Sequence, residues 1–152
     1  MSLRERITAG LKTAMREKDK TRISTLRLIN AAIKDQDIEA RSKGTSEGVN
    51  EADVLAILGK MVKQRQESAR AYEEGGRLEL AEKERAEIEV IENFLPRQLS
   101  ETEVEAAISA AITDAGASSI RDMGRVMGVL KGQYMGQMDF GAVGPLVKAR
   151  LM

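Results

Sequence analysis

The residue types and spacing best suited to chemistry occur in one stretch, "RDMGRVMGVLKGQYMG", at positions 121–136. Glycine recurs there at every fourth position, and three cations accompany the glycines: Gly124, Gly128, Gly132 and Gly136, with Arg121, Arg125 and Lys131. Lysine and arginine bind phosphate oxygens through charge-assisted hydrogen bonds, and glycine lets a ligand or another chain come close to the backbone. The stretch therefore favours the binding of an anion or of a closely packed partner.

An amphipathic helix positions these residues. Steps of about 100° per residue place its apolar side chains within one arc, which must face the core: Met123, Val126, Met127, Leu130 and Tyr134. The first three glycines and the three cations fall on the outer side, and Gly136 is expected to end the helix in the left-handed conformation. Three interior glycines cost about 3 kcal/mol relative to alanine. Two interpretations explain them: another helix from the first domain or another subunit packs closely there, or a phosphate backbone does.

Other chemistry has little support in the sequence. Cysteine and histidine are absent, which excludes disulfides, thiol nucleophiles, the usual zinc sites and a histidine base. No glycine-rich nucleotide-binding motif occurs, and the four aromatic residues are too scattered to stack single-stranded RNA. The acidic run Glu82, Glu84, Glu87 and Glu89 is interpreted as solvation of a surface helix, with a metal site or acid/base pair as the alternative. We predict no catalytic residue, no metal and no cofactor.

Composition indicates long solvated helices around an aliphatic core. The chain is 42% hydrophobic, 3% aromatic and 32% charged, with only two prolines. No apolar run approaches the roughly 20 residues of a membrane span, and the N-terminal "MSLRERITAG" lacks the apolar block of a signal peptide. The expectation is a cytoplasmic protein without membrane contact.

The charge is zero in total but segregated along the chain. Residues 1–30 hold eight Lys/Arg against three Asp/Glu, residues 31–115 hold eleven against nineteen, and residues 116–152 hold five against two. A neutral total argues against a protein that coats nucleic acid indiscriminately, and no DNA binding is expected. The two basic ends are compatible with a modest anion-binding face near the C-terminus and a second contact on the first helices.

Caps, apolar spacing and glycines predict an all-α protein with helices over residues 3–19, 21–41, 51–74, 77–95, 100–115, 120–135 and after 139. The first has a Ser2–Glu5 capping box and an apolar face of Leu3, Ile7, Leu11 and Met15, and residues 42–50 form a loop. The third and fourth form a long antiparallel hairpin with an apolar base and a charged tip. That tip is either a solvated structure or a projecting recognition arm.

A domain boundary is predicted at Pro96, which ends a helix and precedes a capping box at Ser100 and Glu103. Residues 1–96 are expected to form an N-terminal four-helix unit, and residues 97–152 a small three-helix domain. Pro145 falls inside the last helix, where it removes a hydrogen bond, so that helix is expected to begin late or to bend.

Three blocks in order resemble the YqeY family: "TLRLINAAIKDQDIEAR", "YEEGGRLELAEKERAEIEVIENFLPRQLSE" and "DMGRVMGVLKGQYMG". These are small bacterial proteins whose C-terminal part is similar to the tail of GatB, the tRNA-binding subunit of the tRNA-dependent amidotransferase. The resemblance implies an all-helical protein with a larger N-terminal and a small C-terminal domain. It also implies that the residues matching the tail face tRNA: Gly124, Arg125, Gly128, Lys131 and Gly136. Gln137 departs from the Lys or Arg common in the family, and the catalytic body of the amidotransferase subunit has no counterpart here.

The leading hypothesis is a noncatalytic adaptor that recognises tRNA, or an aminoacyl-tRNA-processing enzyme, through residues 116–152. Its RNA-binding residues are the seven glycines and cations of the stretch 121–136. The first alternative is a protein-interaction module whose glycine face receives another helix. The second is an accessory to a carbon–nitrogen ligase that uses glutamine as amido donor.

Overall fold

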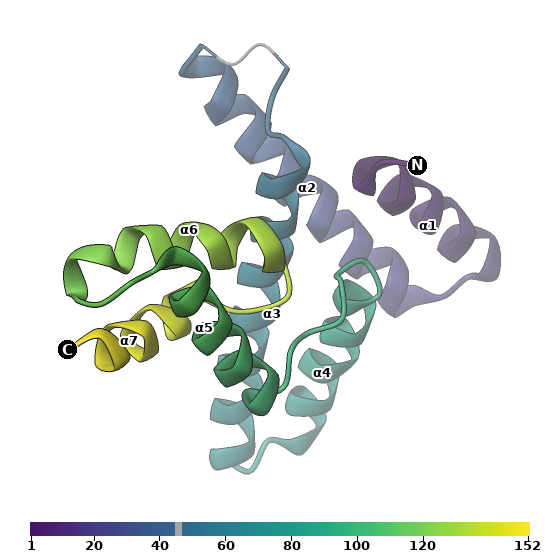
Figure 1. Cartoon of the computed structure of the whole chain (residues 1–152). Helices are drawn as coiled ribbons and strands as arrows, with labels where there is room; N and C mark the ends of the chain where they lie inside the picture. Colours follow the sequence, from purple (N-terminus) through teal and green to yellow (C-terminus); the bar gives the residue numbers. More distant parts are fainter. Residues whose placement is uncertain (45–46) are drawn as a thin grey trace. The chain divides into compact units, whose positions relative to one another are not determined.

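A computed structural model of the chain describes residues 1–44 and 47–152, and every regular element within them is helical (Figure 1). The all-α prediction is therefore confirmed. The chain divides into two compact units, Met1–Leu95 and Pro96–Met152. Of the loop predicted at 42–50, residues 45 and 46 lie outside the described residues, and Ser42 is the last residue of the preceding helix.

Four helices build the N-terminal unit: α1 (Leu3–Glu17), α2 (Lys20–Ser42), α3 (Glu51–Glu74) and α4 (Leu78–Glu92). Each contributes aliphatic side chains to a single core, among them Ile7, Leu26, Leu58 and Ile91, which are fully buried. α3 and α4 form the predicted antiparallel hairpin, and the turn between them contains Gly76 at φ +74° (Figure 1). The hairpin base joins this core, whereas Leu78 at the tip is 61% exposed.

One carboxylate of the hairpin differs from its predicted role. Glu87 was expected to be solvated, but it is 9% exposed and accepts a 2.9 Å hydrogen bond from Arg65 Nε. Arg65 also donates to the Met61 carbonyl. A buried charge requires a partner, and Arg65 on α3 is the partner of Glu87 on α4. This ion pair therefore links the two helices of the hairpin.

The start and end of α1 depart from the sequence prediction in detail. Ser2 Oγ accepts from the Glu5 amide, which is one half of the predicted box, and the neighbouring Leu3 amide donates to Glu51 on α3. Met15 is 49% exposed, and Ala14 is fully buried in its place. Ala14 lies closer than Met15 to the arc of Leu3 and Ile7 on a helix with about 100° per residue, which explains the exchange.

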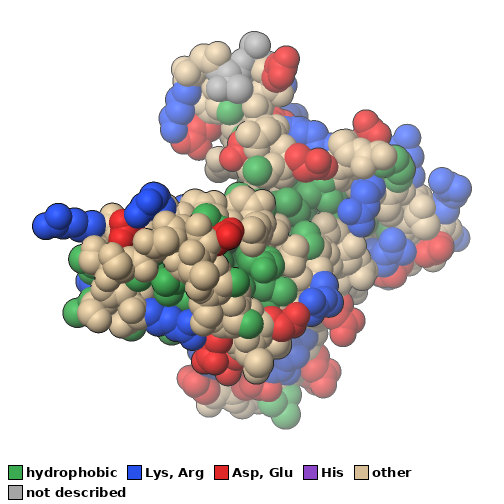
Figure 2. All heavy atoms as spheres, in the orientation of Figure 1, with side chains coloured by type: hydrophobic (Ala, Val, Ile, Leu, Met, Phe, Trp, Pro, Cys, Tyr) green, Lys and Arg blue, Asp and Glu red, His purple; other side chains and the backbone are tan. Residues whose placement is uncertain are grey.

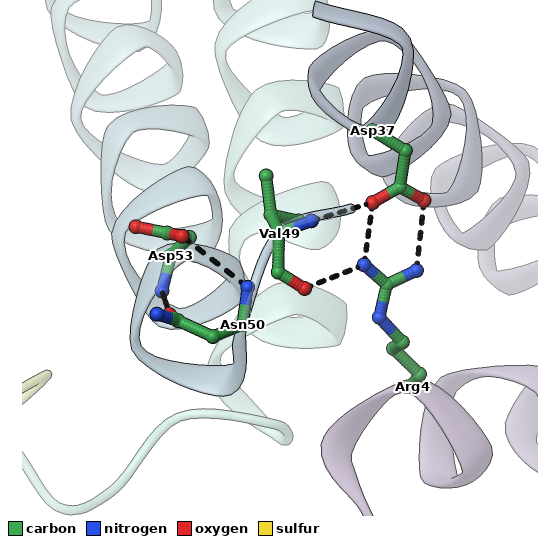
Figure 3. Close-up of polar contacts among 5 residues, drawn as sticks. All are labelled: Arg4, Asp37, Val49, Asn50 and Asp53. Carbon is green, nitrogen blue, oxygen red and sulfur yellow. Dashed lines mark hydrogen bonds and ion pairs between the residues drawn. The ribbon is translucent and has the colours of Figure 1, made fainter. Parts of the chain in front are cut away.

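A polar cluster joins α1, α2 and the segment before α3 (Figure 3). Arg4 donates two hydrogen bonds to the Asp37 carboxylate, at 2.9 and 2.6 Å, and a third to the Val49 carbonyl at 2.8 Å. The Val49 amide donates back to Asp37. We call Arg4, Asp37, Gly48 and Val49 the N-terminal latch, because these contacts hold the segment before α3 against α1 and α2.

The latch has electrostatic and steric consequences. The Arg4 guanidinium and the Val49 amide hold the pKa of Asp37 well below its ordinary range, so this carboxyl stays ionised despite its burial. Gly48 has φ +83°, and a Cβ there would lie 2.9 Å from the Asp37 Cγ. The next residues then start α3 with a reciprocal capping box between Asn50 and Asp53 (Figure 3).

Three helices and one short turn build the C-terminal unit: α5 (Glu101–Ala115), a 3₁₀ turn (Ile120–Asp122), α6 (Met123–Tyr134) and α7 (Phe140–Leu151). Their buried side chains include Ile108, Val126, Leu130 and Val147, each at most 1% exposed. The predicted apolar arc of α6 is confirmed, because its other members, Met123, Met127 and Tyr134, pack against the same cluster.

The segment before α5 is tied to the turn after α6. The predicted Ser100–Glu103 capping box is present. Arg97 donates two hydrogen bonds to Glu103, which lowers the pKa of that carboxyl to about 2. The Leu99 amide donates to the Gln137 carbonyl at 2.9 Å, so the start of this small unit is joined through the backbone to the turn between α6 and α7.

The sequence predicted that α7 follows Asp139 and either begins late or bends at Pro145, and the late start is not observed. The helix begins at Phe140, five positions before Pro145, with Asp139 accepting a hydrogen bond from the Gly141 amide. Proline removes one helical hydrogen bond, and its ring crowds the carbonyl four residues earlier. The helix continues through Pro145 because Val143, Val147 and Leu151 bury its apolar side.

Candidate nucleic-acid interface

The outer side of α6 carries the glycines, and nothing in the C-terminal unit packs against them. A Cβ built on Gly124, Gly128 or Gly132 meets no atom within 4 Å, and all three residues are exposed. In Figure 2, the surface over α6 is largely tan backbone and uncharged atoms, with Lys and Arg side chains at its left end. We call the outer side of Gly124, Arg125, Gly128, Lys131 and Gly132 the glycine face.

The two cations of the glycine face border the glycines. With steps of about 100°, Lys131 lies on one edge and Arg125 on the other. Lys131 is exposed. The Arg125 side chain is 64% exposed and forms an ion pair with Asp122, one turn earlier.

Asp122 contacts the predicted site residue Arg125, and the sequence analysis did not single it out. It accepts hydrogen bonds from the Ser118 and Ser119 amides, at 3.0 and 3.3 Å, as well as from Arg125. The Ser118 amide and the Arg125 guanidinium lower the pKa of Asp122, so the carboxylate stays charged and competes with any anion for Arg125. The i, i+3 spacing of Asp122 and Arg125 was the available signal.

Two of the seven predicted site residues lie outside α6. Arg121 is exposed but belongs to the 3₁₀ turn, because α6 begins only at Met123. A 3₁₀ turn has about 120° per residue, which places Arg121 about 120° around the axis from Met123, on the same side as the glycines. Arg121 therefore precedes the glycine face along the chain.

Gly136 has the predicted positive φ, +79°, and directly follows Met135, the C-cap of α6. α6 ends at Tyr134, and Met135 has φ −53° and ψ 125°. With the Gln137 amide donating to the Tyr134 carbonyl at 2.9 Å, these residues form a type II turn, whose third position favours glycine. The Gly136 carbonyl accepts from Gln98 Nε2 at 2.6 Å, so Gly136 connects the unit internally.

The glycine face combines exposed helix backbone with two cations. The segment 116–152 keeps the basic surplus noted above, five Lys/Arg against two Asp/Glu, whereas α5 carries acidic residues. Bare backbone between two cations lets an extended polyanion approach closely while its phosphates reach side chains on both edges. No described group of three or more acidic residues could hold a metal ion.

A hollow of about 430 Å³ lies between α2 and α3 in the N-terminal unit. Its charged lining residues are of both signs: Glu39, Asp53, Lys43 and Lys60. Glu39 and Lys43 already pair at 3.0 Å, and the hollow is open, so it does not gather the convergent polar groups expected of a ligand pocket.

The comparison with protein families shows to which family the chain belongs. The family model described as Yqey-like protein matches residues 4–151, nearly the whole chain. The chain belongs to the YqeY family. The resemblance inferred from the three sequence blocks is therefore confirmed.

Curated relatives of this YqeY family member are fungal. The chain is 33% identical to "Altered inheritance of mitochondria protein 41, mitochondrial" of Lachancea thermotolerans, over 68% of this chain and 54% of the relative. It is 30% identical to the protein of that name from Pyrenophora tritici-repentis, over 84% of this chain and 71% of the relative. A third, from Kluyveromyces lactis, is 34% identical over 68% and 55%. The chain thus spans about half the length of two of these relatives.

These relatives correct the predicted location. They are named as mitochondrial proteins, so the cytoplasmic prediction is contradicted. That prediction rested on the absence of an apolar block, which is a feature of secretory signal peptides. Segments that direct proteins to mitochondria are amphipathic and arginine-rich and have no such block, so its absence does not distinguish the two locations. None of the described helices is both long enough and apolar enough to cross a membrane.

Proposed function

We propose that the C-terminal unit of this YqeY family member binds folded RNA, with tRNA as the preferred class, through the glycine face of α6. One observation supports the proposal above all others. Three glycines in a 12-residue helix stand open to solvent, although alanine at each would stabilise the helix by about 1 kcal/mol. Packing within the unit does not require them, so the requirement must come from a partner.

The charges indicate what kind of partner this is. Arg125 and Lys131 border the glycines, and Arg121 stands at the beginning of α6. An arginine or lysine that neutralises a phosphate releases counterions, which makes binding salt-dependent. The protein acts as a noncatalytic adaptor that holds tRNA, or presents it to an enzyme that processes aminoacyl-tRNA.

The test is a salt titration of tRNA binding. The variant Arg121→Gln/Arg125→Gln/Lys131→Gln is compared with wild type and with Arg70→Gln/Arg77→Gln/Lys83→Gln, which removes the same charge from exposed positions of the hairpin. Each lost phosphate contact reduces the slope of log affinity against log salt by about 0.9 for a duplex. We expect a slope reduced by roughly 2 to 3 in the first variant and unchanged in the second. Equal slopes for both variants would contradict the proposal.

A protein partner is the second candidate, because the C-terminal unit also exposes apolar side chains. Ile120 is 44% exposed and Leu146 is 48% exposed. In this account another helix seats on the glycine face, where a close approach of two backbones needs small residues. Sedimentation of wild type and Gly128→Leu tests it: self-association that the leucine abolishes supports the protein partner, and monomers in both cases contradict a second copy of the chain.

A further inference from the structure

Four cations on α2 recur at intervals of seven residues: Lys20, Arg27, Lys34 and Arg41. All four are exposed. Seven residues of α-helix rise about 10.5 Å and drift by about 20° around the axis. The four side chains therefore form a nearly straight line about 31 Å long on one side of α2, which we call the α2 row.

The rest of α2 leaves the row accessible. The opposite side of the helix is buried in the N-terminal core through Leu26, Ile29 and Ile33. Small exposed residues, Ser24 and Ala31, separate the first three cations, so no bulky side chain stands between them. The exposed Ile38 takes the corresponding position before Arg41. The helix is continuous over its 23 residues (Figure 1).

The charges of the row are not neutralised within the chain. In the described part of the protein, no ion pair involves any of its four cations. The nearby acidic residues form ion pairs with other cations: Asp37 with Arg4, Glu39 with Lys43 and Glu17 with Arg22. Arg41 is close enough to Asp37 to contribute to its lowered pKa. Asp35 lies about 100° around the helix from Lys34. Four like charges held in line without an ion pair to any described residue favour a polyanionic partner.

We propose that the α2 row binds the phosphate backbone of folded RNA, as a second contact separate from the glycine face. The identity of the polyanion as RNA rests on the proposed function of the C-terminal unit. A small anion cannot span the row, whereas a nucleic-acid backbone places a charge every few ångströms and meets all four cations in any register. The N-terminal unit then holds the RNA without reading its sequence, because phosphate contacts position and do not specify.

A membrane surface fits the row less well. A helix that lies in a membrane interface buries its own apolar side among the lipids and keeps its cations beside the headgroups. The apolar side of α2 is already occupied by the core. Only Leu28 and Ile38 are large apolar residues exposed on this helix, at 47% and 56%, and they do not form a continuous face.

The experiment uses the full chain and three variants: Lys20→Gln/Arg27→Gln/Lys34→Gln, the glycine-face triple Arg121→Gln/Arg125→Gln/Lys131→Gln, and the hairpin control Arg70→Gln/Arg77→Gln/Lys83→Gln. Arg41 is left intact because it stands one turn from Asp37 in the latch. Binding of unfractionated tRNA is measured between 50 and 200 mM salt, and melting temperatures confirm that all variants fold. We expect the α2 triple to lose about tenfold or more in affinity and 2 to 3 in salt slope.

The outcomes separate the two proposals. Loss of affinity in the α2 triple with an unchanged hairpin control supports the α2 row, whatever the glycine-face triple does. An unchanged α2 triple beside a weakened glycine-face triple overturns the α2 row and leaves the proposed function standing. Poly-glutamate and phosphatidylserine vesicles serve as competing probes. The proposal is overturned if either probe, at equal charge, displaces labelled tRNA from the row as effectively as unlabelled tRNA does. The partner is then an acidic protein or a membrane.

Discussion

The N-terminal latch and the glycine face contain the same residue types in opposite circumstances. Each combines an aspartate, an arginine and a glycine: Asp37, Arg4 and Gly48 in the latch, and Asp122, Arg125 and Gly128 at α6. In the latch the carboxylate is 12% exposed and holds three hydrogen bonds, and a methyl on Gly48 would collide with it. At α6 the arginine is 64% exposed, and a methyl on Gly128 would touch nothing.

This difference separates a structural requirement from a functional one. Gly48 is explained entirely by contacts inside its own unit and by its positive φ. Gly128 has no such explanation, because it lies in an ordinary helix where alanine is better by about 1 kcal/mol. The Asp37–Arg4 pair is held by several hydrogen bonds, while Arg125 is exposed enough to exchange Asp122 for another anion.

Gly48→Ala should give the largest effect, a loss of roughly 3 kcal/mol in the free energy of unfolding, because it adds a backbone penalty and displaces a buried carboxylate. Urea denaturation measures it. Gly44→Ala is the matched control, since Gly44 has φ +98° but open space around it. The control isolates the backbone penalty, about 1 to 2 kcal/mol. Equal losses in both variants would show that the contact with Asp37 contributes nothing.

Asp37→Asn should cost about 1.5 to 3 kcal/mol near pH 7, the range for hydrogen bonds to charged groups. Because the pKa of Asp37 is lowered in the folded protein, its stabilising effect is present above the unfolded value of about 3.9 and declines as pH falls below it. Urea midpoints between pH 7 and 3 should therefore converge for wild type and variant. Asp35→Asn, at an exposed neighbouring position, should track wild type at every pH. A difference in urea midpoint that stays constant down to pH 3 would contradict a stabilising role for the ionised Asp37.

Gly128→Ala should raise the free energy of unfolding by about 0.5 to 1 kcal/mol, since the added methyl meets open space in a helix interior. The same change should weaken tRNA binding if the RNA backbone needs close approach. Gly59→Ala, at an equally open glycine of α3, should bring a similar gain in stability with unchanged RNA binding. A destabilised Gly128 variant would show that this glycine is required by packing, as Gly48 is.

Asp122→Asn should give the smallest effect, a roughly two- to fivefold increase in tRNA affinity, because an ion pair exposed to solvent is weak. The substitution releases Arg125, and the asparagine carbonyl can still accept from the Ser118 amide. Asp114→Asn removes the same charge from the exposed end of α5 and serves as control. Equal gains in both variants would indicate a general charge effect and no competition for Arg125.

Much of the fold was predictable because helices are determined by local patterns. The starts of α3 and α5 follow from Asn50 and Ser100, whose side chains cap the amides three residues later. The apolar arc of α6 follows from its spacing alone. The candidate site was predictable to the same extent: five of its residues share the face that the helical angle assigns, while Arg121 and Gly136 fall in a 3₁₀ turn and a type II turn that spacing cannot distinguish from helix.

By itself, the sequence determined the all-helical class, the positions of the caps and the outward direction of the α6 glycines, because each depends on interactions within four residues along the chain. Only the tertiary structure decided which charged side chains form ion pairs within the chain. Arg4 finds Asp37 across 33 positions, and Arg65 finds Glu87 across 22. Such pairs arise when packed helices bring distant residues together, so spacing cannot predict which cations remain free to bind a partner.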